Sequence, residues 1–138
     1  MPTNADLLLD TSAAVALCLA SADGHNAVLE RTAGAVLGLA GHAGVETYSV
    51  LTRLPGTQRL SADVALRVIE QNFSAAHHLG ADRAHAALSE FTDLGISGSS
   101  VYDGLVALAA HEADILLLSR DRRAAPVYSR IGTRFELL

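Results

Sequence analysis

Short apolar runs of strand length alternate along this chain with longer stretches in which apolar residues recur at helical spacing. The runs fall at residues 7–10, 35–39, 75–79, 115–119 and 133–137, and the helical stretches at residues 11–19, 23–32, 43–54, 61–73, 81–94, 101–113 and 121–129. Strands that are apolar on both faces are typical of a parallel sheet covered by helices on both sides. We therefore predict an α/β/α sandwich with a parallel sheet of about four to five strands, forming a single domain over residues 1–138.

Composition supports a folded chain in a reducing compartment. Of the 138 residues, 50% are hydrophobic and 18% charged, which is enough to bury a core and argues against disorder. The net charge of −5 excludes a broadly basic nucleic-acid-binding surface. Cys18, the single cysteine, lies in an apolar run, so we expect it to pack as a small hydrophobe and expect no internal disulfide. With no signal peptide or membrane span expected, the predicted location is the cytoplasm.

Four acidic residues stand where a predicted strand ends or a predicted helix begins. They are Asp10, Glu46, Asp103 and Asp121. In parallel sheets, functional groups collect at the carboxyl ends of the strands, so the fold can bring these side chains together. Carboxylates a few ångströms apart repel one another, and a divalent cation relieves that repulsion. Oxygen-rich sites suit Mg²⁺ or Mn²⁺, so the pattern indicates a metal-dependent hydrolase.

Two of these acids also have a structural interpretation at a helix start. Asp10 can cap the helix that follows, although Thr11 and Ser12 are cap candidates as well. Ser100 and Asp103 have the spacing of a capping box, in which the aspartate is favoured by the helix dipole. Capping and a role in a cleft are compatible, so both interpretations stay open for these residues.

The other two acids have structural alternatives of their own. Glu46 can be a solvated helix residue that faces Arg53 or water. Asp121 can cap the short helix predicted after it. In that case a solvated basic cluster surrounds it, formed by Arg120, Arg122 and Arg123.

Several other enzyme classes are excluded by missing motifs. The histidines lack the paired spacing of zinc sites, and the chain has no phosphate-binding glycine loop and no nucleophile elbow. All ten basic residues are arginine. Receiver domains and aspartyl-phosphate phosphatases, which also place acids at strand ends, use a lysine that this chain lacks.

The four acidic segments resemble the motifs of PIN-domain ribonucleases, specifically VapC-type toxins of bacterial toxin–antitoxin pairs. The segments are L-L-L-D-T-S-A, E-T-Y-S-V-L-T-R-L-P, Y-D-G-L-V-A-L-A-A and L-L-L-S-R-D-R-R, and the likeness extends over essentially the whole chain. Ser12 matches the hydroxyl that accompanies the first acid, and Ser119 stands where the family has threonine or serine. Gly104 departs from the alanine that often follows the third acid, which is expected to loosen that helical turn.

The resemblance implies a fold, a chemistry and partners. It implies an acidic pocket that holds one or two Mg²⁺ or Mn²⁺ ions and hydrolyses RNA phosphodiester bonds. Asp10, Asp103 and Asp121 would be metal ligands, and Glu46 would complete the shell or position the attacking water. It also implies a homodimer and a small antitoxin protein as partner. The arginines that would grip the flanking phosphates are Arg120, Arg122, Arg123 and, less directly, Arg53.

Two alternatives to a ribonuclease remain open from the sequence. The first is a catalytically silent PIN-like module that only binds RNA or protein. The second is a nuclease directed at DNA, because no residue pattern identifies a 2′-hydroxyl reader. The apolar stretches at residues 13–19 and 45–54 are either faces for the antitoxin or parts of the core, and their helical spacing favours the core.

Overall fold

A parallel five-stranded sheet forms the centre of the molecule in this computed structural model, which describes residues 4–138. The strand order is β3-β2-β1-β4-β5, and every neighbouring pair is parallel. This arrangement confirms the predicted α/β/α sandwich. The strands are β1 (Leu7–Leu9), β2 (Leu37–Ala40), β3 (Ala75–His77), β4 (Leu117–Ser119) and β5 (Phe135–Leu137).

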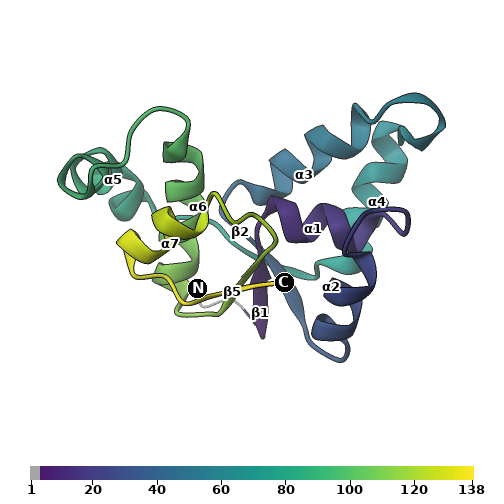
Figure 1. Ribbon diagram of the computed structural model, residues 1–138, viewed down its shortest axis with the longest axis horizontal. Coiled ribbons are helices and arrows are strands. Elements are labelled where there is room, and N and C mark those ends of the chain that lie inside the picture. Colours follow the sequence, from purple (N-terminus) through teal and green to yellow (C-terminus); the bar gives the residue numbers. More distant parts are fainter. Residues whose placement is uncertain (1–3) are drawn as a thin grey trace.

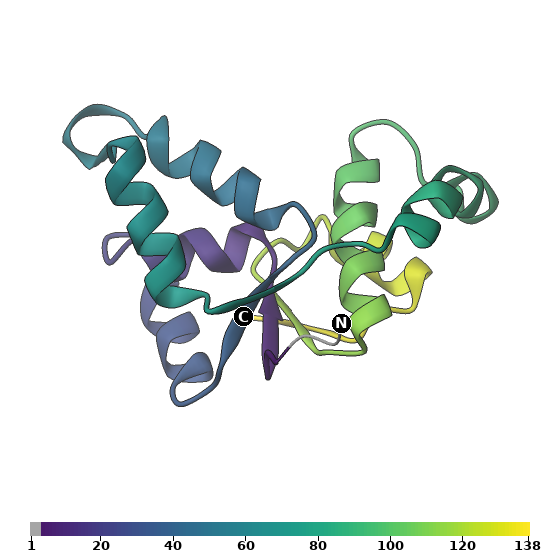
Figure 2. The same cartoon turned by 180° about the vertical axis from the view of Figure 1, so that it is seen from behind.

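The helices cover the two faces of the sheet in separate groups (Figure 1). One face carries α1 (Thr11–Cys18), α2 (His25–Thr32), α3 (Ala43–Thr52) and α4 (Ala62–Asn72), and the other carries α5 (Ala81–Leu94), α6 (Ser100–Ala113) and α7 (Ala125–Ile131). The chain passes from the first group to the second after α4, through β3 to α5 (Figure 2). Within residues 4–138, none of these helices has the length and apolar character needed to cross a membrane.

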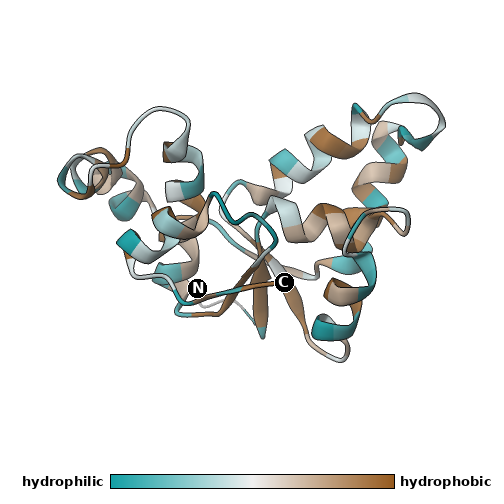
Figure 3. Cartoon of the chain, in the orientation of Figure 1, coloured by the Kyte–Doolittle hydropathy of each residue, from teal (hydrophilic) through white to brown (hydrophobic). Residues whose placement is uncertain are grey.

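The strands supply both hydrophobic cores because successive side chains point to opposite faces. Leu7 and Leu9 of β1 pack into the core beneath α1 to α4, whereas Leu8 packs into the core beneath α5 to α7. The strands accordingly form the apolar centre of Figure 3. Cys18 packs at the edge of the first core as predicted, and burial raises the pKa of its thiol to about 11, which keeps it protonated and unreactive.

Several helix ends have a local chemical cause. The Ser61 hydroxyl accepts a bond from the Val64 amide at the start of α4. Gly95 and Gly132 end α5 and α7 in the left-handed conformation that glycine adopts at little cost. The predicted elements are all present, with ends shifted by a few residues. The clearest shift is in α7, which begins at Ala125 rather than at residue 121.

One short element was not predicted, and the strand order adds information that the sequence does not carry. A single turn of 3₁₀ helix, η1 (Gly56–Gln58), follows α3. The order of strands reverses between β1 and β4, since β2 and β3 continue to one side and β5 to the other. In open parallel sheets, ligands bind beyond the carboxyl ends of the strands at such a switch point.

Candidate active site

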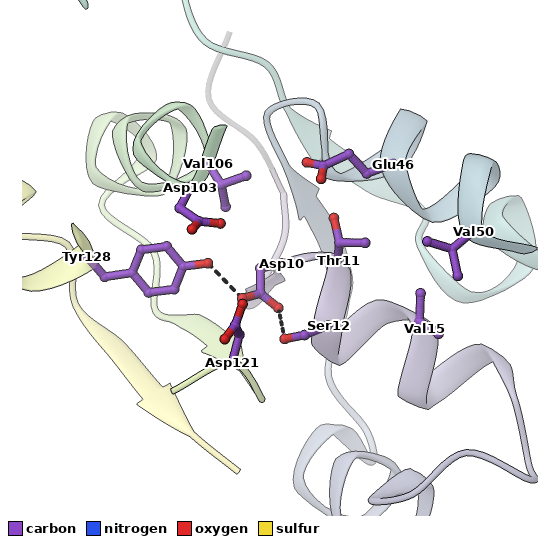
Figure 4. Close-up of a pocket in the computed structure, with 10 residues that line it drawn as sticks. All are labelled: Asp10, Thr11, Ser12, Val15, Glu46, Val50, Asp103, Val106, Asp121 and Tyr128. Atoms are coloured by element: carbon purple, nitrogen blue, oxygen red, sulfur yellow. Dashed lines mark hydrogen bonds between the residues drawn. The ribbon is translucent and has the colours of Figure 1, made fainter. Parts of the chain in front are cut away.

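The acidic pocket, a cavity of about 360 Å³, lies at this switch point (Figure 4). Asp10 follows β1, Asp121 follows β4, and Glu46 and Asp103 lie in the first turns of α3 and α6. The structure thus brings together all four acids singled out in the sequence. The full lining is Asp10, Thr11, Ser12, Val15, Glu46, Val50, Asp103, Val106, Asp121 and Tyr128.

Asp10 is held by donors on both of its carboxylate oxygens. Its Oδ1 accepts from the Ser12 hydroxyl at 2.6 Å and from the Ala13 amide at 3.0 Å. Its Oδ2 accepts from the Tyr128 hydroxyl at 2.7 Å. Of the three cap candidates in the sequence, Asp10 rather than Thr11 or Ser12 therefore caps α1. Asp10 is only 4% exposed, and the three donors fix the direction of its carboxylate.

Ser12 and Ser119 connect the ends of β1 and β4. The Ser12 hydroxyl accepts from the Arg120 amide at 2.8 Å, and the Ser119 hydroxyl accepts from the Asp121 amide at 3.0 Å. The two hydroxyl oxygens are 3.5 Å apart. Each serine therefore holds the backbone that carries a pocket residue, and the position of Asp121 depends on both.

Asp121 sits in a turn rather than at a helix cap. Its Oδ1 accepts from the Arg123 amide at 2.9 Å, which is a local side-chain turn. The helix α7 starts later, with Ala124 at its N-cap position, so the prediction that Asp121 caps it was wrong. The turn leaves the carboxylate facing the acidic pocket.

Asp103 is half-buried and surrounded by the other acids. Its pKa is raised by burial first, and then by the negative charges of Asp121, Asp10 and Glu46, while Arg123 opposes the shift. The predicted capping box was wrong, since α6 has its N-cap at Ser99 and no side-chain cap bond. Asp103 thus lies one position too far into the helix to serve as the reciprocal cap.

Glu46 faces the acidic pocket from α3 and pairs with a histidine, not with Arg53. Its Oε1 lies 2.9 Å from His42 Nε2, one turn earlier, although the two atoms make no hydrogen bond. This contact is an ion pair only when the imidazole is protonated. Figure 4 shows Glu46 and Asp103 entering the pocket from opposite sides.

The three arginines that follow β4 have different surroundings. Arg120 points away from the acidic pocket: its guanidinium packs over Gly24 and donates to the Leu138 carbonyl at 3.1 Å. Arg122 is exposed. Arg123 has a side chain 94% exposed, with Nε 3.6 Å from Asp121 Oδ1, so it stands at the rim of the pocket.

The donor set of the pocket fits a hard divalent cation. In the part of the chain that the structure describes, no three His, Cys, Asp or Glu side chains are close enough together to hold one metal ion at once. The four carboxylates nevertheless line one pocket, and their mutual repulsion raises the pKa of Asp103. A cation between them would remove that repulsion, and oxygen ligands are those that Mg²⁺ and Mn²⁺ prefer.

Two pocket residues were not identified as functional from the sequence. Tyr128 lies far along the chain from Asp10. The one signal for it in the sequence is its position in the helix that follows the fourth acid. The Thr11 hydroxyl is buried with no hydrogen-bond partner among residues 4–138, and it points toward Glu46 in Figure 4. The remaining wall is apolar, formed by Val15, Val50 and Val106.

Comparison with known proteins identifies the family of this chain. The profile of the PIN domain family matches residues 7–129. The chain belongs to the PIN-domain family. Its relatives include Ribonuclease VapC27 of Mycobacterium tuberculosis H37Rv, which is 40% identical over 126 residues covering 91% of this chain and 92% of the relative. Ribonuclease VapC40 of the same species is 36% identical over 131 residues, covering 94% of this chain and 96% of the relative.

Solved structures share the fold of this PIN domain at lower identity. Mycobacterium tuberculosis VapC20, described as a toxin that cleaves the sarcin-ricin loop, has a TM-score of 0.66 at 20% identity, covering 87% of this chain and 93% of that one. Rickettsia felis VapBC2, bound to a promoter DNA fragment, has a TM-score of 0.67 at 15% identity, with 95% and 97% covered. These two likenesses concern the fold alone.

Proposed function

We propose that this PIN domain is a divalent-metal-dependent endoribonuclease and the toxin of a toxin–antitoxin pair in the cytoplasm. The observation that carries the proposal is the convergence of Asp10, Glu46, Asp103 and Asp121, from four separate segments, on one pocket at the switch point of the sheet. The curated relatives are ribonucleases by name, which supports RNA as the substrate over DNA.

In this proposal the pocket residues hold one or two Mg²⁺ or Mn²⁺ ions. Asp10, Asp103 and Asp121 would be the metal ligands, and Glu46 would complete the shell or orient the attacking water. The metal supplies charge neutralisation at the phosphate and a water of lowered pKa. The protein supplies rigid placement, since Ser12 and Tyr128 fix the Asp10 carboxylate before any ion arrives.

Basic contacts to RNA are assigned to the arginines at the rim. Arg123 stands beside Asp121 and is free to reach a phosphate, and the exposed Arg122 follows the same turn. The Arg120 guanidinium packs against Gly24 and donates to the Leu138 carbonyl. Arg120 therefore stabilises the turn after β4 rather than contacting the substrate. The cation in the pocket lets a polyanion approach four carboxylates that otherwise repel it.

The partner proposed for the toxin is a small antitoxin protein. The stretch at residues 13–19 is mostly core, with Ala13, Ala14, Ala16 and Leu17 buried. The helix α3 differs, because Val45 is 72% exposed and borders an apolar groove between α3 and α4. We assign an apolar segment of the antitoxin to this groove, whose lining is Gly41, Gly44, Val45, Tyr48, Leu66, Ile69 and His78. A homodimer also remains part of the proposal.

The first test of the proposal is Asp10→Asn. Asparagine keeps the shape of the side chain but removes the charge that a divalent ion needs, so cleavage of total cellular RNA in Mg²⁺ should be lost. EDTA should silence the wild type in the same assay, and added Mn²⁺ or Mg²⁺ should restore it. Circular dichroism of Asp10→Asn should match the wild type and so separate lost chemistry from lost fold.

Two results would reject the proposal in different ways. Full activity of Asp10→Asn with Mg²⁺ present would remove Asp10 from the site. A wild-type protein that binds neither Mg²⁺ nor Mn²⁺ in calorimetry and cuts no RNA would indicate the catalytically silent binding module instead. Parallel incubation with single-stranded DNA decides between the ribonuclease and a DNA-directed nuclease.

A further inference from the structure

A second cavity of about 400 Å³, here called the outer cavity, opens beside the acidic pocket. It shares Glu46, Asp103 and Asp121 with the pocket. Its other lining residues are Ser99, Ser100, Tyr102 and Arg123. Its volume is within the range of small-molecule sites. An RNA strand with a phosphate among the four carboxylates therefore has room for a neighbouring nucleotide in the outer cavity.

Tyr102 is the exposed aromatic residue that lines the outer cavity. It lies in the first turn of α6, next to Asp103, and is 59% exposed. Its ring makes a T-shaped contact with His42, with centroids 6.2 Å apart and planes at 80°. His42 precedes α3, so the contact joins the two helices that carry Glu46 and Asp103. The ring is thus supported on one side and accessible to solvent over most of its surface.

The remaining groups of the outer cavity suit a phosphate and a sugar. Arg123 offers a guanidinium that is 94% exposed, with its Nε 3.6 Å from Asp121 Oδ1. Ser99 and Ser100 offer hydroxyls at the start of α6. An aromatic ring, a guanidinium and hydroxyls are the groups with which proteins bind single-stranded nucleic acid, through stacking on bases and contact with phosphates.

We propose that the outer cavity is a nucleotide subsite, in which Tyr102 stacks on the base beside the scissile phosphate and Arg123 contacts that nucleotide's phosphate. This inference rests on the proposed ribonuclease function and extends it. Stacking tolerates any base, so Tyr102 provides affinity and register along the strand rather than sequence selection. Tyr102 and Asp103 are consecutive residues of α6. The same helical turn therefore positions the stacked base and the Asp103 carboxylate.

The binding test uses the Asp10→Asn protein, which should not cut RNA and carries one fewer of the carboxylates that repel it. Its affinity for a short fluorescein-labelled oligoadenylate in Mg²⁺ is measured by fluorescence anisotropy. Adding Tyr102→Ala should weaken binding about 5- to 150-fold, the range for loss of one stacked base. Tyr102→Phe keeps the ring and should bind as before, whereas Tyr102→Leu keeps only apolar bulk and should lose most of the affinity.

Two matched controls isolate the stacking contact. Tyr48 is also exposed on the surface but borders the apolar groove, so Tyr48→Ala should leave binding of the oligoadenylate unchanged. An abasic oligomer of the same length keeps the phosphates, so it should bind equally with tyrosine or alanine at position 102. Arg123→Gln should reduce the slope of log affinity against log salt by about 0.7, the value for one phosphate on a single strand.

The outcomes separate this inference from the proposed function. Metal-dependent cleavage by the wild type, together with oligoadenylate binding that Tyr102→Ala does not change, would overturn the subsite and leave the nuclease intact. Equal loss in Tyr102→Phe and Tyr102→Ala would also overturn it, because the hydroxyl and not the ring would then be the contact. Absence of metal-dependent cleavage in the wild type would reject the proposed function itself.

Discussion

Asp10 is the most constrained carboxylate of the acidic pocket, because a strand end, a helix start and a distant tyrosine all fix its oxygens. Tyr128 is 1% exposed and its hydroxyl donates to Asp10 Oδ2. Burial, and after it the nearby charge of Asp10, raises the pKa of Tyr128 far above its usual range. The tyrosine therefore stays a donor at every working pH, and the Asp10 carboxylate keeps one orientation.

Asp103, by contrast, destabilises the folded protein when its carboxylate is ionised and no metal is bound. Because its pKa is raised above the ordinary 3.8, the folded state binds this proton more tightly than the unfolded state does. The unfolding free energy of the metal-free protein should then fall as pH rises from the ordinary value through the raised one. Above that window the repulsion is fully present.

Asp103→Asn should therefore raise the Tm of the protein in EDTA at neutral pH while abolishing cleavage. In the wild type, Mg²⁺ should raise the Tm, because the ion binds the folded state and neutralises the carboxylates. The variant should show little of this increase. Thermal unfolding with EDTA and with Mg²⁺, at acidic and neutral pH, measures both effects. A variant less stable than the wild type in EDTA at neutral pH would contradict the assigned repulsion.

At the scale of elements, α6 is positioned by an unusually close approach to α5. Gly104 is buried, and a Cβ at this position would lie 2.7 Å from Cε1 of Phe91, which is itself 3% exposed. The sequence suggested that glycine here loosens the first turn of α6. The structure adds the compensating reason, because the missing side chain admits the Phe91 ring against the turn that carries Asp103.

Gly104→Ala should consequently destabilise the protein despite the better helix propensity of alanine. The propensity gain is about 1 kcal/mol, whereas overpacking a buried site costs about 1–3 kcal/mol. A net loss of about 1 kcal/mol corresponds to a fall in Tm of roughly 3–5 °C. The double variant with Phe91→Leu should lose less than the sum of the two single changes, since the smaller side chain makes room. A Tm raised by Gly104→Ala alone would show that the ring moves freely.

Local patterns in the sequence predicted the helices, the strands and the four acidic residues. They did not predict the long-range contacts. Apolar runs and glycine ends identify strands and helices because the cause lies within a few residues. The acids were recognisable because each follows a strand or opens a helix. The bond from Tyr128 to Asp10 joins residues 118 positions apart. Such a bond follows only from the packing of α7 against the sheet, which no local pattern specifies.

For the whole molecule, the strand order decides how the faces are used. The reversal between β1 and β4 opens the acidic pocket, while the apolar groove lies between α3 and α4. The helix α3 borders both, with Glu46 and Val50 on the pocket and Val45 and Tyr48 on the groove. A protein seated in the groove would therefore contact the helix that carries one of the four acids.

Aspartate at two exposed positions of the groove should separate antitoxin binding from catalysis. Val45 and Leu66 are 72% and 50% exposed, so Val45→Asp and Leu66→Asp should leave the fold intact. Burying either side chain against a partner is worth about 1.5–3 kcal/mol, so each change should weaken binding at least tenfold. Co-purification with the co-expressed product of the adjacent upstream gene, followed by titration calorimetry, measures the loss.

Leu88→Asp is the control, because Leu88 is 76% exposed on α5, away from the groove. Metal-dependent RNA cleavage should persist in all three variants. The antitoxin would bind another face if Leu88→Asp lost binding equally, or if Val45→Asp and Leu66→Asp retained it.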